Sequence, residues 1–402
     1  MNVLMMSLMY PEDMADEVRH NAKDKIQNQI NSYQRAFVDG IRGNLNNGEA
    51  FHILNALPVG VFPMQYRKLR IPAGPHDGNS IYELGCINLP WMKRYMRMKR
   101  AVRYLTDWAQ QSPQNRTVLL YTLYLPFMQA IDRVKRRFPD LKACVIVTDL
   151  PNELGLASGR KGLLKRLEYM WGNDSMALCQ RMDGFVLLTE PMADALNVRE
   201  KPYTVIEGLI RTDTSSEETS VQAPQMRGTV LYTGTLEPAL GIQELLSAFE
   251  TLPEYDLWIC GQGSMSETVR AAASRCKNIR YFGFVSHQEA LRLQSMATVL
   301  INPRPASGIF TRYSFPSKTL EYMRTGKPVL CYKLEGIPDE YDGHLCYIKQ
   351  DGAQGIASAI RELLTRSPQA LASLGEGART FVLENKNPSM QCKKLIRLLR
   401  AL

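Results

Sequence analysis

The stretch between residues 302 and 330 carries the side chains whose types and spacing are best suited to chemistry. Arg304, Arg312 and Lys318 are cations, and Glu321 follows Lys318 after roughly one helical turn. Arg and Lys side chains bind phosphate oxygens, and a carboxylate accepts hydrogen bonds from two neighbouring hydroxyls. The combination predicts a site for a pyrophosphate with a ribose beside it. The alternative is that Arg304 and Lys318 are solvated and that Glu321 is an ordinary helix former.

A strand, a loop and a short helix must position these side chains. Apolar residues 298–302 predict the strand, and the Pro316–Ser317 pair predicts the start of the helix. Gly326 predicts the end of the helix. The amino end of such a helix presents unpaired N–H groups and a partial positive charge. We expect a ligand there, because α/β sheets bind ligands at the carboxyl ends of their strands.

Length and composition bound the class of protein. A chain of 402 residues predicts two domains, and 45% hydrophobic with 22% charged residues is typical of a globular protein. The eight cysteines form no Cys-x-x-Cys pair, which indicates reduced thiols of a cytosolic protein rather than disulfides or a zinc site. No apolar run approaches the roughly 18 residues of a membrane span. Because the amino terminus also lacks the basic region of a signal peptide, we expect a soluble or peripheral protein.

Strand-like and helical patterns alternate along both halves of the chain, which predicts parallel sheets covered by helices on both faces. Residues 1–208 form the first predicted domain, and a polar run at 209–228 forms a linker. The second domain begins at residue 229. The loop from Ser7 to Asp16 after the first strand is long and has no glycine, so we place no dinucleotide there.

The excess positive charge is concentrated in one region. The net charge is +9, and residues 67–142 alone hold 15 Lys and Arg against 5 Asp and Glu. A helical pattern at 91–105 has an apolar stripe formed by Trp91, Tyr95, Met98, Val102 and Leu105. The cations on the rest of this helix are Lys93, Arg94, Arg97, Lys99, Arg100 and Arg103. A second basic segment contains Arg160 and Lys161.

We expect these cations to face an anionic partner, which is either a membrane surface or a lipid pyrophosphate. A solvated helix face is the alternative. Nucleic acid is the competing partner, but no recognised binding module accompanies the charge, so we expect no nucleic acid to bind.

Asp149 closes the apolar strand that begins at Cys144. A carboxylate at the carboxyl end of a strand is a candidate catalytic or binding group for a hydroxyl of a sugar or an acceptor. A role as a helix N-cap or turn residue is the alternative.

Glycines follow three successive strands of the second half, where the backbone must turn tightly or approach a ligand. The segments concerned, with the two that follow them, are Leu-Tyr-Thr-Gly-Thr (231–235), Ile-Cys-Gly-Gln-Gly (259–263), Tyr-Phe-Gly-Phe-Val (281–285), Ile-Asn-Pro-Arg (301–304) and Phe-Pro-Ser-Lys-Thr-Leu-Glu-Tyr-Met-x-x-Gly-Lys-Pro-Val (315–329). In this order they resemble the nucleotide-binding half of family 4 glycosyltransferases. Within that family the chain is similar to bacterial exopolysaccharide and capsule enzymes.

The resemblance is detailed over about residues 229–340 and extends to the first half in pattern only. It implies an α/β fold of the GT-B type, in which two Rossmann-like domains face each other across a cleft. Residues 1–208 would bind the acceptor, 229–385 would bind the nucleotide-sugar, and 386–402 would form a helix packing back on the first domain. It also implies transfer with retention at the anomeric carbon and no metal or other cofactor, and the sequence contains no Asp-x-Asp motif.

Carried over by residue, the resemblance assigns the ribose of the donor to Glu321. Gly261, Gln262, Phe284 and Val285 stand where the family holds the base. The remaining expected donor-binding positions are Gly234, Thr235, Arg312, Tyr313, Ser314, Phe315, Pro316, Ser317 and Thr319.

The chain departs from the family at its usual pyrophosphate-binding cations, because Thr235 and Leu240 stand in their places. We expect Arg304 and Lys318 to replace them, with help from Arg312. The catalytic candidates are therefore Arg304, Lys318 and Asp149. A second departure is Tyr313, which stands eight residues before Glu321 where the family has another glutamate.

The expected function is transfer of a sugar from a nucleotide-sugar, with UDP as the expected carrier, to a saccharide linked to polyprenyl pyrophosphate. Such an enzyme would work in bacterial surface polysaccharide synthesis, in the cytoplasm and at the inner face of the cell membrane. A nucleotide-sugar epimerase of the same fold and a non-catalytic glycosyltransferase-like subunit are the alternatives.

Overall fold

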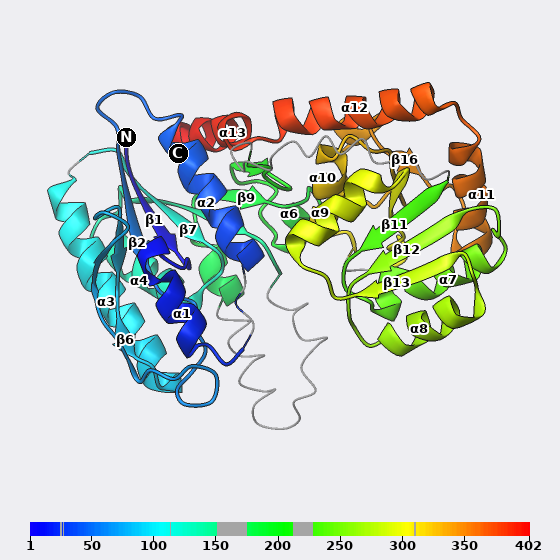
Figure 1. Ribbon diagram of the computed structural model, residues 1–402. Coiled ribbons are helices and arrows are strands. Elements are labelled where there is room, and N and C mark those ends of the chain that lie inside the picture. The colour runs from blue at the N-terminus through cyan, green and yellow to red at the C-terminus, as the bar shows by residue number, and fades with distance from the viewer. Residues whose placement is uncertain (25, 27, 113, 151–174, 212–227, 309–310) are drawn as a thin grey trace. The chain divides into compact units, whose positions relative to one another are not determined.

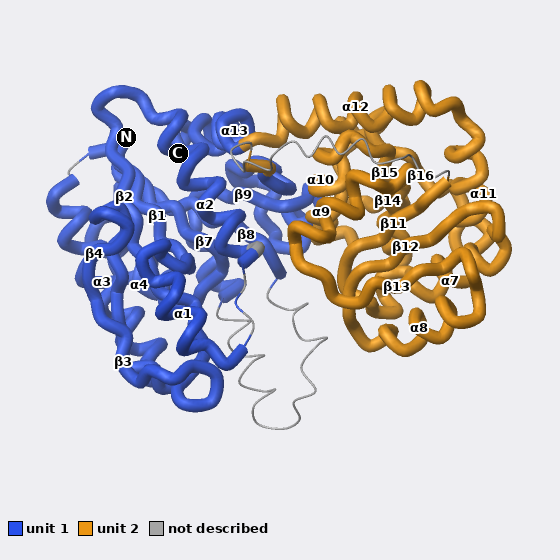
Figure 2. Tube along the Cα trace, in the orientation of Figure 1, with its two compact units in different colours: residues 1–209, 388–402 blue, residues 210–387 orange. Residues whose placement is uncertain are grey.

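Both units of the computed structural model are α/β structures with a sheet of their own (Figure 1). The structure describes residues 1–402 apart from 25, 27, 113, 151–174, 212–227 and 309–310. Unit 1 comprises residues 1–209 and 388–402, and unit 2 comprises residues 210–387 (Figure 2). Most of the predicted linker at 209–228 lies outside the described residues.

In the described part of unit 1, the sheet has eight strands in the order β10-β9-β8-β7-β1-β2-β5-β4. They are β1 (Asn2–Ser7), β2 (Ala50–Asn55), β4 (Gly74–His76), β5 (Ile81–Glu83), β7 (Arg116–Tyr121), β8 (Lys142–Val147), β9 (Gly184–Leu187) and β10 (Tyr203–Val205). All neighbouring pairs are parallel except β4 and β5 at one edge. The central strands are almost wholly buried, which explains their nearly continuous apolar sequences.

The described part of unit 1 includes the helices α1 (Ala15–Asn21), α2 (Asn28–Arg42), α3 (Pro90–Gln111), α4 (Leu125–Lys135), α6 (Met192–Ala195) and α13 (Pro388–Ala401). A short antiparallel pair, β3 (Arg70–Ile71) and β6 (Cys86–Ile87), lies outside the main sheet. Gly85 separates β5 from β6. Its φ is +58°, and a Cβ there would lie 2.5 Å from the backbone nitrogen of Ala73. Only glycine fits this turn. Glu83 is the last residue of β5 before the turn and lies at the carboxyl end of the main sheet.

The C-terminal helix α13 belongs to unit 1, where it packs on α2. Cys392 and Leu395 are fully buried there in one apolar cluster with Phe37. Gly40 of α2 permits the close approach, because a Cβ at this position would lie 2.4 Å from the carbonyl oxygen of Pro388 and 2.5 Å from the Sγ of Cys392.

In the described part of unit 2, six parallel strands form a sheet in the order β13-β12-β11-β14-β15-β16. They are β11 (Thr229–Thr233), β12 (Asp256–Cys260), β13 (Ile279–Gly283), β14 (Val299–Asn302), β15 (Val329–Cys331) and β16 (Cys346–Tyr347). The helices are α7 (Ile242–Glu250), α8 (Ser266–Arg275), α9 (His287–Met296), α10 (Ser317–Arg324), α11 (Gly352–Leu364) and α12 (Pro368–Asn385).

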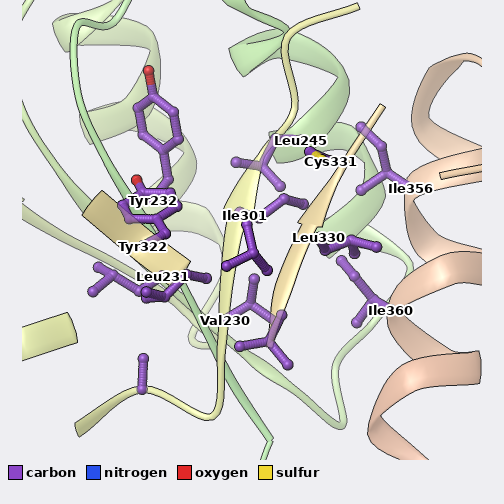
Figure 3. Packing of buried hydrophobic residues seen from close by; sticks show 14 of the residues in the cluster. Val230, Leu231, Tyr232, Leu245, Ile301, Tyr322, Leu330, Cys331, Ile356 and Ile360 are labelled. Atoms are coloured by element: carbon purple, nitrogen blue, oxygen red, sulfur yellow. The ribbon is translucent and has the colours of Figure 1, made fainter. Parts of the chain in front are cut away.

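The core of unit 2 lies between the central strands and the flanking helices (Figure 3). Val230, Ile301 and Leu330 come from three adjacent strands, and Leu245 of α7 and Ile360 of α11 belong to the same buried cluster. Burying each of these side chains contributes roughly 1.5–3 kcal/mol to the stability of the fold. This packing holds in place the sheet edge that α10 adjoins.

Replacing Gly40 by Ala should lower the free energy of unfolding by about 1–3 kcal/mol, because the added methyl group forces α13 away from α2. Gly43→Ala is the matched control, since the nearest atom to a Cβ there is 3.4 Å away. Urea unfolding measures both variants. A Gly40→Ala variant as stable as the wild type would show that α13 does not pack closely on α2 at this position.

Candidate functional site

The short helix α10 begins where the sequence predicts it, at Ser317 after an extended Pro316. Among the described residues, no side chain caps its amino end, so the N–H groups of Ser317 and Lys318 are available to an anion. Phe315, Pro316 and Thr319 are buried, which leaves only their backbone groups for a ligand. The helix end therefore has the donors that the predicted phosphate site needs.

The carboxylate of Glu321 is held by donors from two helices. Lys318 Nζ lies 2.9 Å from both carboxylate oxygens, and the amide of Gln294 in α9 donates to Oε1 at 2.8 Å. The side chains of Lys318 and Glu321 are 32% and 26% exposed, so both can be reached from solvent. The sequence predicts two separate ligand contacts here, and the structure joins them in one ion pair.

Gln294 is fully buried, and its amide links the Glu321 carboxylate to the last residue of a strand. Its Nε2 also donates to Thr233 Oγ1 at 3.1 Å. The hydroxyl of Tyr322 donates to the carbonyl of Thr233 at 3.0 Å and accepts the N–H of Thr233 at 2.8 Å. Since Thr233 is the last residue of β11, these bonds fix α9 and α10 to the carboxyl edge of the sheet.

The two predicted arginine contacts, Arg304 and Arg312, both belong to the loop between β14 and α10 but have different partners. Arg304 bonds within the loop. It donates through Nη2 to Ser314 Oγ at 2.7 Å, and burial lowers the pKa of its guanidinium. Arg312 forms an ion pair with Glu335 at 2.8 Å and stands 5.9 Å from the ring centre of Tyr313. The structure thus brings Arg304 and Ser314 together and gives Arg312 a carboxylate partner.

The glycines after β11 and β12 are explained by packing between two loops. A Cβ at Gly261 would lie 1.7 Å from the carbonyl oxygen of Gly234, and a Cβ at Gly263 would lie 2.2 Å from that of Leu236. The sequence leaves open whether such glycines serve a turn or a ligand. For Gly261 and Gly263, the close approach of the neighbouring backbone is sufficient reason.

The positions expected to hold the base follow β12 and β13, and another expected donor-binding position, Thr235, follows the adjacent strand β11. Phe284, after β13, is 75% exposed, and Val285 beside it is half-buried. Gln262 after β12 and Thr235 after β11 are exposed. An exposed aromatic ring at this edge is available for stacking on a base.

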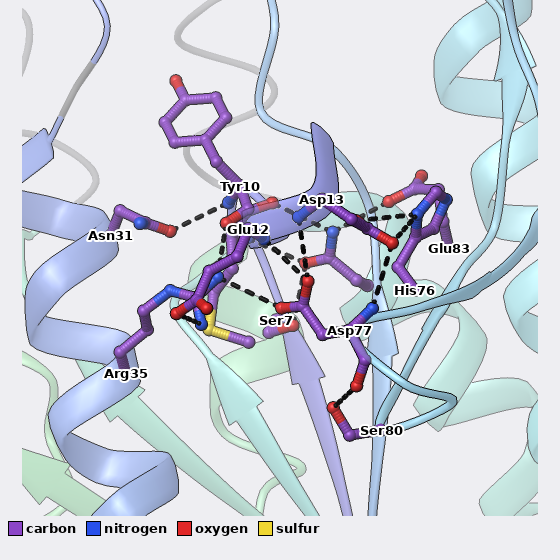
Figure 4. A network of polar contacts seen from close by, with 12 residues as sticks. Ser7, Tyr10, Glu12, Asp13, Asn31, Arg35, His76, Asp77, Ser80 and Glu83 are labelled. Atoms are coloured by element: carbon purple, nitrogen blue, oxygen red, sulfur yellow. Dashed lines mark hydrogen bonds and ion pairs between the residues drawn. The ribbon is translucent and has the colours of Figure 1, made fainter. Parts of the chain in front are cut away.

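In unit 1, polar side chains rather than glycines fix the loop after β1 (Figure 4). Asp13 lies 3.0 Å from His76 Nδ1, and Asp77 accepts the backbone N–H groups of Glu12 and Asp13. Asn55, at the end of β2, accepts from Ser7 Oγ and donates to Glu83, each at 2.8 Å. These contacts hold the loop in place. The loop has no glycine motif, and side chains determine its conformation instead.

Asp149 is exposed directly after β8, at the carboxyl edge of the sheet in unit 1. Thr148 beside it contacts Thr122 at 3.2 Å. Residues 151–174 lie outside the described part, so both the binding role of Asp149 and its alternative as an N-cap stay predictions.

The predicted apolar stripe of the helix at 91–105 is buried at Met98 and Leu105, as expected, but the prediction is wrong for the first turns of the helix. Trp91 and Tyr95 were assigned to the apolar stripe, yet they are 63% and 59% exposed. Lys93 and Arg97 were expected to face a membrane or an anionic acceptor, and they are only 8% and 3% exposed.

Lys93 and Arg97 point inward because the chain that leaves β2 presents backbone carbonyls that need donors. Lys93 Nζ donates to the carbonyl of Val59, and Arg97 donates to the carbonyl of Leu57. Glu83 accepts the N–H of Leu57 at 3.0 Å and lies within electrostatic reach of both cations. Burial lowers the pKa of Lys93 to about 7 and raises the pKa of Glu83.

The other basic positions of α3 differ in exposure. Arg94 and Arg103 are exposed, as is Lys99. Arg100 is half-buried and donates to the carbonyl of Leu84 at 2.7 Å. The predicted contacts Arg160 and Lys161 lie outside the described residues.

Sequence reasoning missed Gln294, Thr233 and Tyr322. The available signal was a glutamine beside Leu293 in the helix at 287–296, where a buried amide requires partners. Those partners are distant in sequence, so the signal predicts a bond without identifying it.

Comparisons with known proteins match most of unit 2. Residues 227–366 match the family model described as "Glycosyl transferases group 1". The chain is also 30% identical to the O-antigen chain mannosyltransferase B of Escherichia coli over 122 residues, which is 28% of this chain and 30% of that protein. The alignment therefore spans less than a third of either protein.

Solved structures resemble the whole chain. Sucrose-phosphate synthase from Thermosynechococcus elongatus has a TM-score of 0.63 at 16% identity, covering 100% of this chain and 99% of that structure. The HepE protein of Anabaena, solved in complex with UDP, has a TM-score of 0.57 at 12% identity and covers 100% of both chains. Together with the two Rossmann-like units, these likenesses establish the GT-B fold.

Every helix in the described part of the chain is too short or too polar to span a membrane. The described residues also contain no group of three or more His, Cys, Asp or Glu side chains placed to hold a metal ion. All eight cysteines lie in the described part and are free thiols.

The buried ammonium of Lys93 should make stability depend on pH. Its pKa is about 7 in the folded protein against an ordinary value of 10.5. Between these values the unfolded chain binds a proton that the folded chain does not, so the free energy of unfolding should rise from about pH 7 to about pH 10. One pKa unit corresponds to about 1.4 kcal/mol, which sets the scale of the rise.

Lys93→Met should remove this part of the pH dependence, whereas Lys99→Met should keep it because Lys99 is exposed on the same helix. Urea unfolding at both ends of the pH range measures the difference. The same dependence in the wild type and in Lys93→Met would show that the ammonium is not buried.

Proposed function

We propose that the chain is a glycosyltransferase that moves a sugar from a UDP-linked donor, with retention, to a saccharide on polyprenyl pyrophosphate in bacterial surface polysaccharide synthesis. The observation that carries the proposal is the Lys318–Glu321 pair at the uncapped amino end of α10. The match to an O-antigen mannosyltransferase supports sugar transfer, and the UDP complex of a protein with the same fold supports a UDP-linked donor.

In this proposal, unit 2 stabilises the charge that develops as the nucleoside diphosphate leaves. The N–H groups of Ser317 and Lys318, with the side chains of Arg304 and Lys318, meet the phosphate oxygens. Glu321 binds the ribose, and Phe284 stacks on the base. Asp149 binds a hydroxyl of the acceptor. No metal takes part, because the helix end and the two cations supply the positive charge.

A thermal-shift panel of UDP-, GDP- and dTDP-sugars tests the donor site. One of them should raise the Tm of the wild type, and Glu321→Ala should weaken its binding by about tenfold or more, since hydrogen bonds to a charged group contribute roughly 1.5–3 kcal/mol. Glu362→Ala is the control, because that exposed carboxylate lies on α11. Equal affinity of Glu321→Ala and wild type in calorimetry would exclude the ribose contact.

The reaction itself separates the proposal from its alternatives. A transferase consumes the donor sugar only when an acceptor is present, whereas an epimerase converts the donor alone. Binding of no nucleotide in the panel would indicate a non-catalytic subunit. Donor consumption by membranes that contain lipid-linked saccharide, and not by buffer, is the expected result.

We also propose that the exposed end of α3 contacts an anionic membrane. Trp91 and Tyr95 present aromatic rings there, and Arg94, Lys99 and Arg103 are exposed cations of the same helix. Aromatic rings with cations are typical of surfaces that lie at a membrane interface. This replaces Lys93 and Arg97, whose side chains are buried, as the expected contacts.

Changing Arg94, Lys99 and Arg103 together to Glu should release the protein from anionic vesicles, because each basic residue near such a surface contributes about 1 kcal/mol. A flotation assay measures the bound fraction. The control changes Arg270, Arg275 and Lys349, which are exposed cations of unit 2, to Glu. If both variants bind the vesicles equally well, the exposed cations of α3 form a solvated helix face and not a membrane contact.

A further inference from the structure

We propose that Gln294 and Lys318 together make the ribose contact of Glu321 conditional on a bound diphosphate. Gln294 holds the carboxylate in place, and Lys318 occupies both of its oxygens until phosphate oxygens draw the ammonium away. The protein therefore binds a nucleoside that lacks the diphosphate more weakly than it would without Lys318. This inference rests on the proposed nucleotide site and assigns its specificity to two residues.

The direction of each hydrogen bond around Gln294 follows from the groups present. A carboxylate only accepts, so Gln294 presents its NH₂ group to Glu321 and its second N–H to Thr233 Oγ1. The hydroxyl of Tyr322 donates to the carbonyl of Thr233, so the Thr233 hydroxyl donates to the Tyr322 oxygen at 3.1 Å. Each proton has one acceptor in this arrangement.

The orientation of the Gln294 amide is therefore set by acceptors on two sides. Its Oε1 is buried and has no hydrogen-bond partner among the described residues. Leaving a buried acceptor unpaired is costly, and rotating the amide would break two good bonds to gain none with Glu321. Gln294 is thus a positioning residue, which anchors the Glu321 carboxylate to the end of β11.

The ion pair with Lys318 leaves neither oxygen of Glu321 without a donor. A carboxylate oxygen accepts about two hydrogen bonds, so Oε1 is filled by Gln294 and by Lys318 Nζ at 2.9 Å, and Oε2 has one site left beside Nζ at 2.9 Å. Two vicinal hydroxyls of a ribose need two acceptor sites, so a ribose displaces Lys318 from at least one oxygen. The pair is partly exposed, and ion pairs of this kind are weak, so a stronger anion can take the ammonium.

A diphosphate at the amino end of α10 is such an anion. Lys318 stands in the first turn of this helix, so its ammonium can turn from Glu321 to phosphate oxygens without a change in the backbone. A nucleoside alone breaks the ion pair and gives Lys318 no new partner. A nucleoside diphosphate breaks the same pair and replaces it with charge-assisted bonds to phosphate.

Binding of UDP and of uridine to Lys318→Met tests the role of Lys318. UDP is measured by calorimetry, and uridine by NMR titration; if the panel selects another base, its diphosphate and nucleoside are used. UDP should bind about tenfold or more weakly, and uridine should bind up to about fivefold more tightly. The gain for uridine is the decisive readout, because a simple phosphate contact would not produce it.

Lys349→Met is the matched control for this experiment. Lys349 is an exposed lysine that pairs with Glu362 at 3.4 Å, away from α10 in sequence. Its substitution should leave both affinities unchanged. Thermal unfolding of each variant confirms that it is folded.

Discrimination between UDP and 2′-deoxy-UDP tests the role of Gln294. The wild type should prefer UDP, and Gln294→Met, which keeps the volume and removes both hydrogen bonds, should reduce that preference several-fold. Thr233→Val removes the second acceptor of the amide, together with the bond from the Thr233 hydroxyl to Tyr322, and leaves the bond from Gln294 to Glu321, so it should show a smaller loss. It also keeps the test possible if Gln294→Met does not fold.

The outcomes separate this inference from the proposed function. Absence of UDP binding by the wild type would overturn both. Tight UDP binding with no gain for uridine in Lys318→Met would overturn the role of Lys318 alone. Unchanged discrimination against 2′-deoxy-UDP in both Gln294→Met and Thr233→Val would overturn the role of Gln294.

Discussion

The hydrogen bonds that join the end of β11 to α9 and α10 are the contacts on which the proposed site depends. An isolated helix as short as α10 is unstable in water, so its orientation must come from its surroundings. Tyr322 and Gln294 both bind Thr233, and Gln294 passes this constraint on to Glu321. The carboxylate and the amino end of the helix are thereby fixed to the same strand end.

Backbone groups at strand ends shape both units, but they are satisfied in different ways. In unit 2, glycines let two loops pack directly on each other, with Gly261 against Gly234. In unit 1, buried side chains supply the missing donors, and Lys93 and Arg97 reach the carbonyls after β2. The edge in unit 2 is the one at which the proposed function places a nucleotide, because parallel α/β sheets bind ligands at the carboxyl ends of their strands.

Much of the fold and part of the site could be predicted from the sequence, because local patterns determine them. Pro316 and Gly326 define α10, and Gly326 has a φ of +72°, as the end of a helix requires. The burial of Met98 and Leu105 in α3 could be predicted, but that of Lys93 and Arg97 could not, since a helical wheel treats these cations as outward-facing. The carbonyls that draw them inward lie 34 and 40 residues away in sequence. The hydrogen bonds of Gln294 could not be predicted for the same reason, because its partners are 61 and 27 residues away in sequence.

The most direct measurement is a crystal structure of the protein with UDP. The account predicts the diphosphate on the N–H groups at the amino end of α10, the ribose hydroxyls on Glu321, and the ammonium of Lys318 turned from the carboxylate to the phosphates. UDP bound at another place, or bound there with the Lys318–Glu321 pair intact, would contradict the account.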